Sequence, residues 1–407
     1  MTMSHTSYFP EDVTTSEATN DIPRDAIATF HRSLPRYRVT ALYSCPTIAQ
    51  RLGVKSVLVK DESVRLGLPS FKMLGASWAT ATAIGREWIG SKEPPVSLRW
   101  IDREMRRRFG PKWRIDRRLV AATDGNHGRG VARMARVLRL PALIFVPAGT
   151  AESRIRGIEN EGARVEVVEG TYDDAIARSA REASSTTLVI SDTSWEGYTE
   201  TPTNVINGYS TMFSEMDQQL SGKTLDIVTL QAGVGAFAAA GMSHWSARDA
   251  NVRPRFVVVE PTAANCLMLS ARSREITLAP GPHDSTMAGL NCGLPSLIAW
   301  PVISQFADAF VAIDDDIAFD TMRLLADCGI VAGESGAAGL AGLLAITDES
   351  ERSLMGLHSD ATVLVINTEG ATDPDNYKRV VGSTNQEVIR TRRRRQHVTQ
   401  TVRLPDR

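Results

Sequence analysis

Cysteine is scarce in this chain, with four residues among 407. None of the four stands at the spacing of a zinc site, and no histidine–cysteine cluster accompanies them, so we expect no bound metal. So few cysteines suit a reducing compartment, which indicates a cytoplasmic protein. An excess of charge of either sign is missing as well, because the formal net charge is −1. This balance gives no reason to expect nucleic acid as a partner.

Long apolar runs are equally absent. No run approaches the roughly 18 residues that a membrane-spanning helix needs, so we expect no membrane partner. The first 20 residues are polar and lack the apolar segment of a secretory signal. One basic run stands out, Arg390–Arg395, which we interpret as a solvated tail or helix end.

The chain has an ordinary globular composition, with 43% hydrophobic and 23% charged residues. Apolar, β-branched runs predict strands over 56–60, 118–123, 142–147, 163–168, 187–190, 226–230, 255–260 and 362–366. Between them, helices are predicted over 73–88, 127–138, 151–162, 171–183 and 236–246. The segment 91–112, with two prolines and many arginines, is interpreted as a surface excursion. This alternation of strands and helices is typical of an α/β fold with mainly parallel sheets.

A chain of 407 residues is long for one hydrophobic core and sufficient for two. We therefore predict two three-layer α/β/α domains. The larger would comprise 30–74 with 216–390 and the smaller 75–215, with terminal extensions at 1–29 and 391–407. Ligands favour domain interfaces and the carboxyl ends of parallel strands, so we expect a ligand in the cleft between the domains.

Three short polar or glycine-rich segments interrupt the apolar pattern: Leu66–Ala76, Ala122–Gly128 and Gln231–Ala236. A lysine, an Asn-His turn and a glycine loop in this order resemble the fold-type II pyridoxal phosphate enzymes. The amino-acid sequences of the motifs are most similar to those of the diaminopropionate ammonia-lyase family, and the resemblance extends over roughly Tyr8 to Tyr377. The resemblance implies pyridoxal 5'-phosphate as cofactor and a small amino acid as substrate.

Lys72 is the residue that the resemblance assigns to the Schiff base. A lysine must be unprotonated to attack an aldehyde, so burial or a nearby cation has to disfavour its ammonium form. A helix start has the same effect, because the dipole there opposes a positive charge. Taken alone, the segment is equally compatible with an ordinary lysine at the start of a helix.

The turn Thr123-Asp-Gly-Asn-His127 follows a predicted strand and opens a predicted helix. Unpaired backbone N–H groups at such a position suit an anion. By resemblance, Thr123, Asp124, Gly125 and His127 bind the substrate, with its carboxylate on the N–H groups, and Asn126 meets the cofactor's ring hydroxyl. The alternative is a common Asp-Gly turn with a capping asparagine.

Two aspartates favour a cationic substrate. Asp124 stands where related threonine and serine dehydratases usually carry a small neutral residue, and a carboxylate there would attract an ammonium group. Asp192 follows the predicted strand 187–190, and the family carries an aspartate in this motif. By resemblance, Lys72 and Asp124 act as bases on opposite faces of the substrate, and Asp192 orients its β-amine. Asp192 is also compatible with a simple helix N-cap.

The loop Gly233, Val234, Gly235 and Ala236 follows a predicted strand and suits a phosphate. Glycines let the backbone approach the anion, and the helix dipole favours it. The same segment also fits the dinucleotide fingerprint, with Glu260 at the end of the next strand in the place of a ribose-binding acid. An NAD-dependent oxidoreductase is therefore a rival interpretation, although it leaves the Lys72 and Asn126 motifs without a purpose.

Further assignments come from the resemblance alone. Thr368 is the candidate neutral partner of the cofactor's ring nitrogen, and Glu334 lies in another family motif. The resemblance implies that Cys266 and Cys292 lie close together and could form a disulfide. Two reduced, buried thiols are the alternative.

We therefore predict a pyridoxal phosphate enzyme, expected to be a homodimer, that eliminates ammonia from D- and L-2,3-diaminopropionate and yields pyruvate. Beside Lys72, the residues Leu66, Pro69 and Ala76 differ from those that the family usually carries at these positions. These departures keep open another fold-type II lyase that acts on threonine, serine or a specialised amino acid. A catalytically inactive relative that only binds is the remaining alternative.

Overall fold

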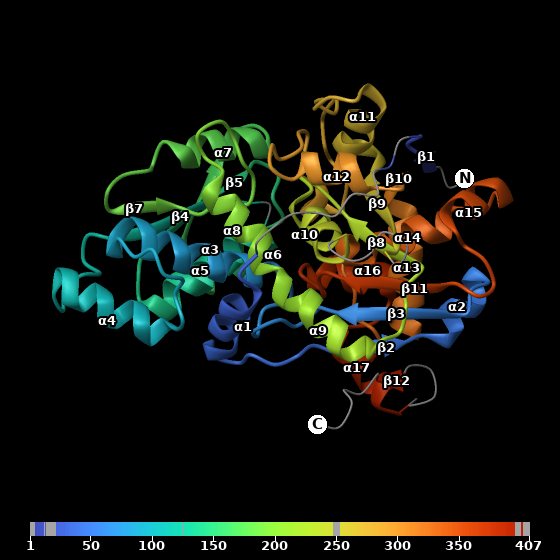
Figure 1. The fold of residues 1–407 in the computed structure, drawn as a ribbon, viewed down its shortest axis with the longest axis horizontal. Coiled ribbons are helices and arrows are strands. Elements are labelled where there is room, and N and C mark those ends of the chain that lie inside the picture. Colours follow the sequence, from blue (N-terminus) through green and yellow to red (C-terminus); the bar gives the residue numbers. More distant parts are fainter. Residues whose placement is uncertain are drawn as a thin grey trace. The chain divides into compact units, whose positions relative to one another are not determined.

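The computed structural model describes residues 5–11, 13, 22–123, 125–246, 253–394 and 400–401. It divides into two compact units, which are described separately. Unit 1 comprises 1–20, 39–64 and 212–407, and unit 2 comprises 21–38 and 65–211 (Figure 1). No helix among the described residues is long and apolar enough to cross a membrane.

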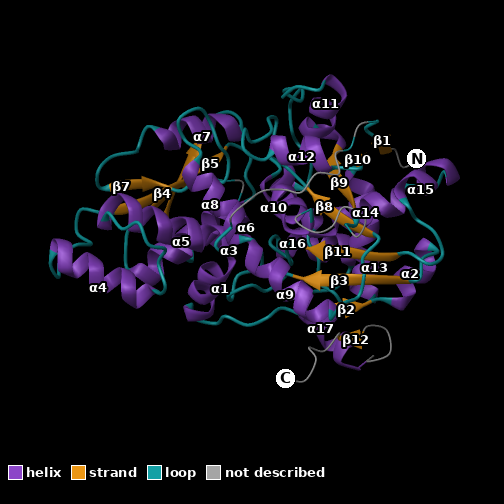
Figure 2. Ribbon diagram, in the orientation of Figure 1, coloured by secondary structure: helices purple, strands orange, loops and turns teal. Residues whose placement is uncertain are grey.

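Unit 2 is built on a four-stranded parallel sheet in the order β6-β5-β4-β7. Its strands are β4 (Arg118–Ala122), β5 (Ala142–Pro147), β6 (Arg164–Val168) and β7 (Thr187–Val189). Its helices are α1 (Arg24–Ser33), α3 (Lys72–Ala83), α4 (Leu98–Phe109), α5 (Asn126–Leu138), α6 (Glu152–Glu159), α7 (Tyr172–Ala180) and α8 (Glu200–Gly208) (Figure 2). Helices α5 and α7 both pack on β4 and β5. The central strands are almost entirely apolar because helices cover the parallel sheet.

Small residues bring the helix that begins at Lys72 close to its neighbours. A Cβ on Gly75 would overlap Val205 and Tyr209, and one on Gly130 would press on Ala76. The backbones of α3, α5 and α8 therefore approach more closely than larger side chains would allow. This packing fixes the start of α3, and with it the position of Lys72.

Unit 1 is built on an eight-stranded sheet in the order β1-β10-β9-β8-β11-β3-β2-β12. The inner strands β3 (Ser56–Asp61), β8 (Ile227–Gln231), β9 (Arg255–Pro261), β10 (Ala309–Ile313) and β11 (Thr362–Asn367) are parallel. The outer strands β1 (His5–Tyr8), β2 (Leu42–Ser44) and β12 (Gln400–Thr401) are antiparallel.

The helices that complete unit 1 are α2 (Pro46–Leu52), α10 (Ala236–Trp245), α11 (Cys266–Ser273), α12 (Trp300–Phe306), α13 (Asp315–Asp327), α14 (Glu334–Ala345), α15 (Glu349–Met355), α16 (Pro374–Val381) and α17 (Asn385–Arg394). The unit boundary falls within α9 (Ser210–Leu220). Helix α14 packs on β8, β9, β10 and β11 and is buried over nearly its whole length. Its glycines and alanines permit this, because a large residue at Gly342 would overlap Val259.

The prediction of an α/β fold with mainly parallel sheets is confirmed, and every predicted strand is present. The interpretation of 91–112 as a plain surface excursion is incomplete, because α4 lies there and buries Ile101 and Met105 fully. The predicted helix 73–88 ends its α-helical part at Ala83 and continues as a π-helix over 84–89. The predicted domain boundaries stay a prediction; residues 65–74 group here with unit 2.

Candidate active site

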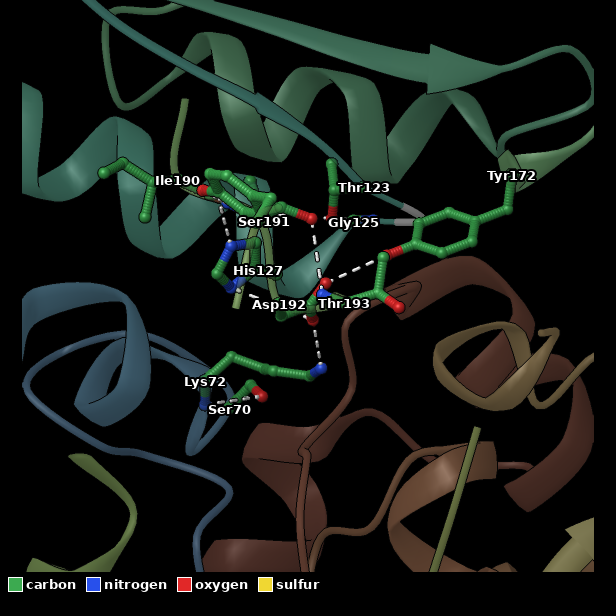
Figure 3. Close-up of polar contacts among 12 residues, drawn as sticks. Ser70, Lys72, Thr123, Gly125, His127, Tyr172, Ile190, Ser191, Asp192 and Thr193 are labelled. Carbon is green, nitrogen blue, oxygen red and sulfur yellow. Dashed lines mark hydrogen bonds and ion pairs between the residues drawn. The ribbon is translucent and has the colours of Figure 1, made fainter. Parts of the chain in front are cut away.

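Lys72 lies at the first position of α3, as the sequence predicts. Its Nζ donates a hydrogen bond to Asp192 Oδ2 over 2.6 Å (Figure 3). The pair is largely removed from solvent, with side-chain exposures of 16% for Lys72 and 5% for Asp192. A carboxylate at this distance stabilises an ammonium strongly, because little water competes for either charge.

Asp192 is held by a second contact that sequence reasoning missed. It follows β7, and its Oδ1 accepts a hydrogen bond of 2.9 Å from the hydroxyl of Tyr172, the first residue of α7. Burial raises the pKa of the Asp192 carboxyl. The positive charge that the His127 ring carries when protonated and the Lys72 ammonium, with the hydrogen bonds from Lys72 and Tyr172, lower it by more, so this pKa lies well below its ordinary value. Asp192 is therefore an anion in this state. It is not a helix N-cap, because the next helix, α8, begins at Glu200 with Thr199 before it.

His127 is the second residue of α5 and is only 1% exposed. Its Nε2 lies 2.8 Å from the carbonyl oxygen of Ile190, and its Nδ1 lies 3.8 Å from Asp192 Oδ2. Burial lowers the pKa of the ring, and the Lys72 charge lowers it further, against the opposing effect of Asp192. The imidazole is thus neutral at physiological pH. The sequence motif placed His127 near the substrate but gave no sign of this pairing.

The turn before α5 is organised by Thr123. Its Oγ1 accepts hydrogen bonds from Gly125 N (2.9 Å) and Gly128 N (3.0 Å). Gly125 has a φ of 147°, which a residue with a side chain rarely adopts. Asn126 begins the helix at the carboxyl end of β4, as predicted. Asp124 lies outside the described residues, so its predicted role remains an expectation from sequence.

Arg154 is a second residue that the sequence analysis did not single out. It lies in α6, is 7% exposed, and its side chain borders Gly125, where an added Cβ would be 3.4 Å from Arg154 Cδ. The sequence could have indicated that Arg154 lies near Gly125. Helix α6 begins shortly after β5, and β5 is the parallel neighbour of β4, so the segments that follow the two strands meet at one edge of the sheet.

The glycine loop joins β8 to α10, as predicted. Gly235 has a φ of 94°, and a Cβ there would lie 2.5 Å from Ile303 Cδ1. Among the described residues, no hydrogen bond uses the backbone N–H of Gly233, Val234 or Gly235. Uncommitted N–H groups directly before a helix N-terminus, at Ala236, form the cradle that a phosphate requires.

Thr368 follows β11 and is nearly fully buried. Its Oγ1 accepts a 2.9 Å hydrogen bond from Gln231 Nε2, whose two hydrogens also have the Ile366 and Ser335 carbonyls within hydrogen-bond distance. The Thr368 hydroxyl itself donates a long hydrogen bond of 3.4 Å to the Ser335 carbonyl, a weak contact that a better-placed acceptor could replace. A neutral hydroxyl held in this way suits the ring nitrogen of a pyridine. The role of Gln231 was not predicted.

Glu260 does not have the surroundings of a ribose-binding acid. It is fully buried, and its two carboxyl oxygens accept hydrogen bonds from Leu267 N (2.8 Å) and Met268 N (2.9 Å) at the start of α11. Burial raises its pKa to about 8, although the two backbone hydrogen bonds oppose this. Glu260 caps a helix, which removes the acid on which the dinucleotide interpretation depended.

Cys266 and Cys292 both lie against the glycine loop. Cys266 Sγ contacts the Gly233 carbonyl at 3.7 Å, and a Cβ on Gly233 would lie 2.8 Å from Cys292 Sγ. The disulfide stays a prediction. Glu334 begins α14, is nearly fully buried and accepts a hydrogen bond from Asn376.

These residues fit pyridoxal phosphate. The loop at Gly235 offers uncommitted N–H groups for a phosphate, Thr368 offers a hydroxyl, and Lys72 offers a primary amine beside a buried carboxylate. These three groups match the phosphate, the ring nitrogen and the aldehyde of the cofactor, respectively.

Comparison with known proteins agrees with this chemistry. A family model described as "Pyridoxal-phosphate dependent enzyme" matches residues 34–369. The diaminopropionate ammonia-lyase of Escherichia coli K12 is 37% identical over 365 residues, which cover 86% of this chain and 89% of the relative. The enzyme of the same name from Salmonella typhimurium LT2 is 36% identical, with coverage of 87% and 91%.

Solved structures give the same result. The crystal structure of the Escherichia coli diaminopropionate ammonia-lyase with D-serine superposes with a TM-score of 0.83 at 32% identity, covering 93% of this chain and 97% of that one. The same enzyme with an aminoacrylate–PLP azomethine reaction intermediate gives a TM-score of 0.82 at 33% identity, with the same coverage. Maize serine racemase, 19% identical with a TM-score of 0.68, shares the fold. The chain belongs to the diaminopropionate ammonia-lyase family of pyridoxal-phosphate-dependent enzymes.

Proposed function

We propose that this enzyme converts D- and L-2,3-diaminopropionate to pyruvate and ammonia by α,β-elimination. The observation that carries the proposal is the buried Lys72–Asp192 ion pair, with a separation of 2.6 Å. It places a carboxylate that binds an ammonium group directly beside the lysine that the cofactor requires. A substrate with a side-chain ammonium matches such a carboxylate, and an anionic side chain would be repelled.

When bound, pyridoxal phosphate supplies an electron sink for the carbanion that forms at Cα. We propose that Lys72 holds the cofactor covalently, that Asn126 meets its ring hydroxyl, and that the loop around Gly235 binds its phosphate. Thr368 would donate its hydroxyl hydrogen to the ring nitrogen. The uncommitted loop N–H groups and the Gln231–Thr368 hydrogen bond support these assignments.

The remaining residues act on the substrate. Thr123 stabilises the turn through two hydrogen bonds, so that Gly125 and the first turn of α5 can receive the carboxylate. The substrate amine would first displace Lys72 from the cofactor; the freed Lys72 amine would then remove the Cα proton on one face and Asp124 on the other, which would account for acceptance of both isomers. Asp192 holds the β-ammonium before it leaves.

The test is to supply the purified enzyme with pyridoxal phosphate and offer D-diaminopropionate, L-diaminopropionate, L-threonine and L-serine separately. We expect pyruvate and two ammonia molecules per turnover from each diaminopropionate isomer. A preference for threonine or serine would instead support the second candidate, a dehydratase. The departures at Leu66, Pro69 and Ala76 in the segment beside Lys72 are the observation that favours it.

We further propose that the enzyme works as a homodimer in the cytoplasm. Twofold oligomers are the commonest assemblies, and the low cysteine content suits a reducing compartment. Light scattering of the eluting protein should then give twice the chain mass of 44.3 kDa. A mass of one chain would contradict the dimer.

A further inference from the structure

The neutral ring of His127 presents a hydrogen-bond acceptor that no described residue uses. Its Nε2 lies 2.8 Å from the Ile190 carbonyl oxygen, and because a carbonyl only accepts, Nε2 carries the hydrogen. The other nitrogen, Nδ1, is buried and has no hydrogen-bond partner among the described residues. In this tautomer Nδ1 carries a lone pair.

The lone pair faces the carboxylate oxygen that binds the Lys72 ammonium. Nδ1 lies 3.8 Å from Asp192 Oδ2, and Lys72 Nζ lies 2.6 Å from the same oxygen. In Figure 3 the three side chains converge from α3, α5 and the segment after β7. Two acceptors that face each other repel unless a donor serves both. Asp192 and His127 thus have the arrangement of a binding site for an ammonium group.

We propose that Asp192 Oδ2 and His127 Nδ1 together form the subsite for the substrate's side-chain ammonium; of these two acceptors, the Lys72 ammonium binds the Asp192 oxygen alone in this structure. The inference rests on the proposed function, in which Lys72 faces the substrate as an uncharged base and so leaves Asp192 without its cation. An ammonium group has three hydrogens, so it can donate to both acceptors and still bond elsewhere.

The subsite discriminates by the number of hydrogens that one atom can donate. The other Asp192 oxygen accepts from Tyr172 over 2.9 Å, so once Lys72 no longer donates to Oδ2, Oδ2 and Nδ1 are the two acceptors here that lack a described partner. A hydroxyl carries one hydrogen and can satisfy only one of them. The second would then stay buried and unpaired, which is costly. His127 is therefore a specificity-determining residue that favours amino substrates over serine and threonine.

Two variants separate the acceptor from the rest of the ring. In His127→Gln, the amide nitrogen can replace Nε2 and keep the bond to Ile190, but nothing replaces Nδ1. In His127→Asn, the amide oxygen stands near the Nδ1 position and restores an acceptor. We expect the Gln variant to lower the ratio of kcat/KM for diaminopropionate to that for serine by about 10- to 100-fold, with partial recovery in the Asn variant.

An unchanged ratio in His127→Gln, or an equal fall in both variants, overturns the subsite. If the parent enzyme does not act on diaminopropionate, the proposed function fails instead, so the two failures are distinguishable. A second measurement does not depend on activity. Nitrogen NMR of the full chain labelled with ¹⁵N-histidine, with and without pyridoxal phosphate, resolves the tautomer, and the His127→Gln spectrum identifies its signal among seven histidines. We expect hydrogen on Nε2 alone at neutral pH; hydrogen on Nδ1 overturns the inference.

Discussion

The substitution Asp192→Asn tests the buried ion pair most directly. It removes the negative charge beside Lys72 but keeps an oxygen that can accept from Tyr172. Breaking one side of a buried pair costs about 3–5 kcal/mol, because the remaining charge is left without compensation. Lys72 retains 16% exposure, so some hydration relieves its ammonium, and we expect a loss of about 3 kcal/mol in unfolding free energy.

The assay is urea unfolding of the cofactor-free protein at pH 7, with Glu152→Gln as the matched control. Glu152 pairs with Arg156 on the exposed surface of the same unit, and such pairs contribute little. A carboxylate with a lowered pKa contributes stability above its unfolded pKa, about 3.9 for aspartate, and loses it as the pH falls toward the folded value. The gap between parent and Asp192→Asn should therefore be full at pH 7 and shrink below pH 4. Equal stabilities of Asp192→Asn and Glu152→Gln at pH 7 would refute the reasoning.

Three further predictions concern the cofactor and the helix cap. Reduction with borohydride should leave a phosphopyridoxyl group on the peptide that contains Lys72, and mass spectrometry should find none in Lys72→Ala; a modified peptide elsewhere would contradict the assignment. Gly235→Ala should weaken pyridoxal phosphate binding by about tenfold or more, because φ is 94° and the added Cβ would overlap Ile303. Equilibrium dialysis measures the binding, with Gly149→Ala as the control. Gly149 also has a positive φ but has open space around it, so the comparison separates an effect on the phosphate loop from general backbone strain. The pKa of Glu260 is raised to about 8, so the folded state binds a proton that the unfolded state has lost, and stability should fall between about pH 5 and 8. Urea titrations of Glu260→Gln should show a flatter profile, and an unchanged slope would contradict the raised pKa.

The parallel strands of the described residues, except β10, could be predicted because their apolar, β-branched runs carry the signal within each segment. Strand β1 could not, since His5–Tyr8 is a short edge strand whose structure depends on pairing with β10 far along the chain. Helix α4 was missed for a different reason. Its many arginines mask an apolar face on which only Ile101 and Met105 are fully buried.

The candidate site shows the same division. The starts of α3, α5 and α10 follow from strand–turn–helix patterns, so the positions of Lys72, Asn126 and Ala236 could be predicted. The contacts that set their chemistry join residues far apart in sequence. Lys72 and Asp192 are 120 positions apart, and Gln231 and Thr368 are 137 apart. A local sequence pattern cannot indicate such pairs, because the two residues come together only in the folded unit, where the segments that follow neighbouring strands lie side by side.

The Lys72–Asp192 pair also predicts how the cofactor is loaded. An ammonium has no lone pair, so Lys72 must lose a proton before it can attack an aldehyde. Asp192, at 2.6 Å, opposes this loss because it stabilises the charged amine. The rate of pyridoxal phosphate attachment to the cofactor-free enzyme, followed by stopped-flow absorbance, should rise with pH. At pH 7 it should be faster in Asp192→Asn than in the parent, even though that variant is less stable. A slower rate would mean that Asp192 assists attachment, and an equal rate would mean that its charge does not affect the Lys72 amine. Either result would contradict the argument that the ion pair opposes attachment.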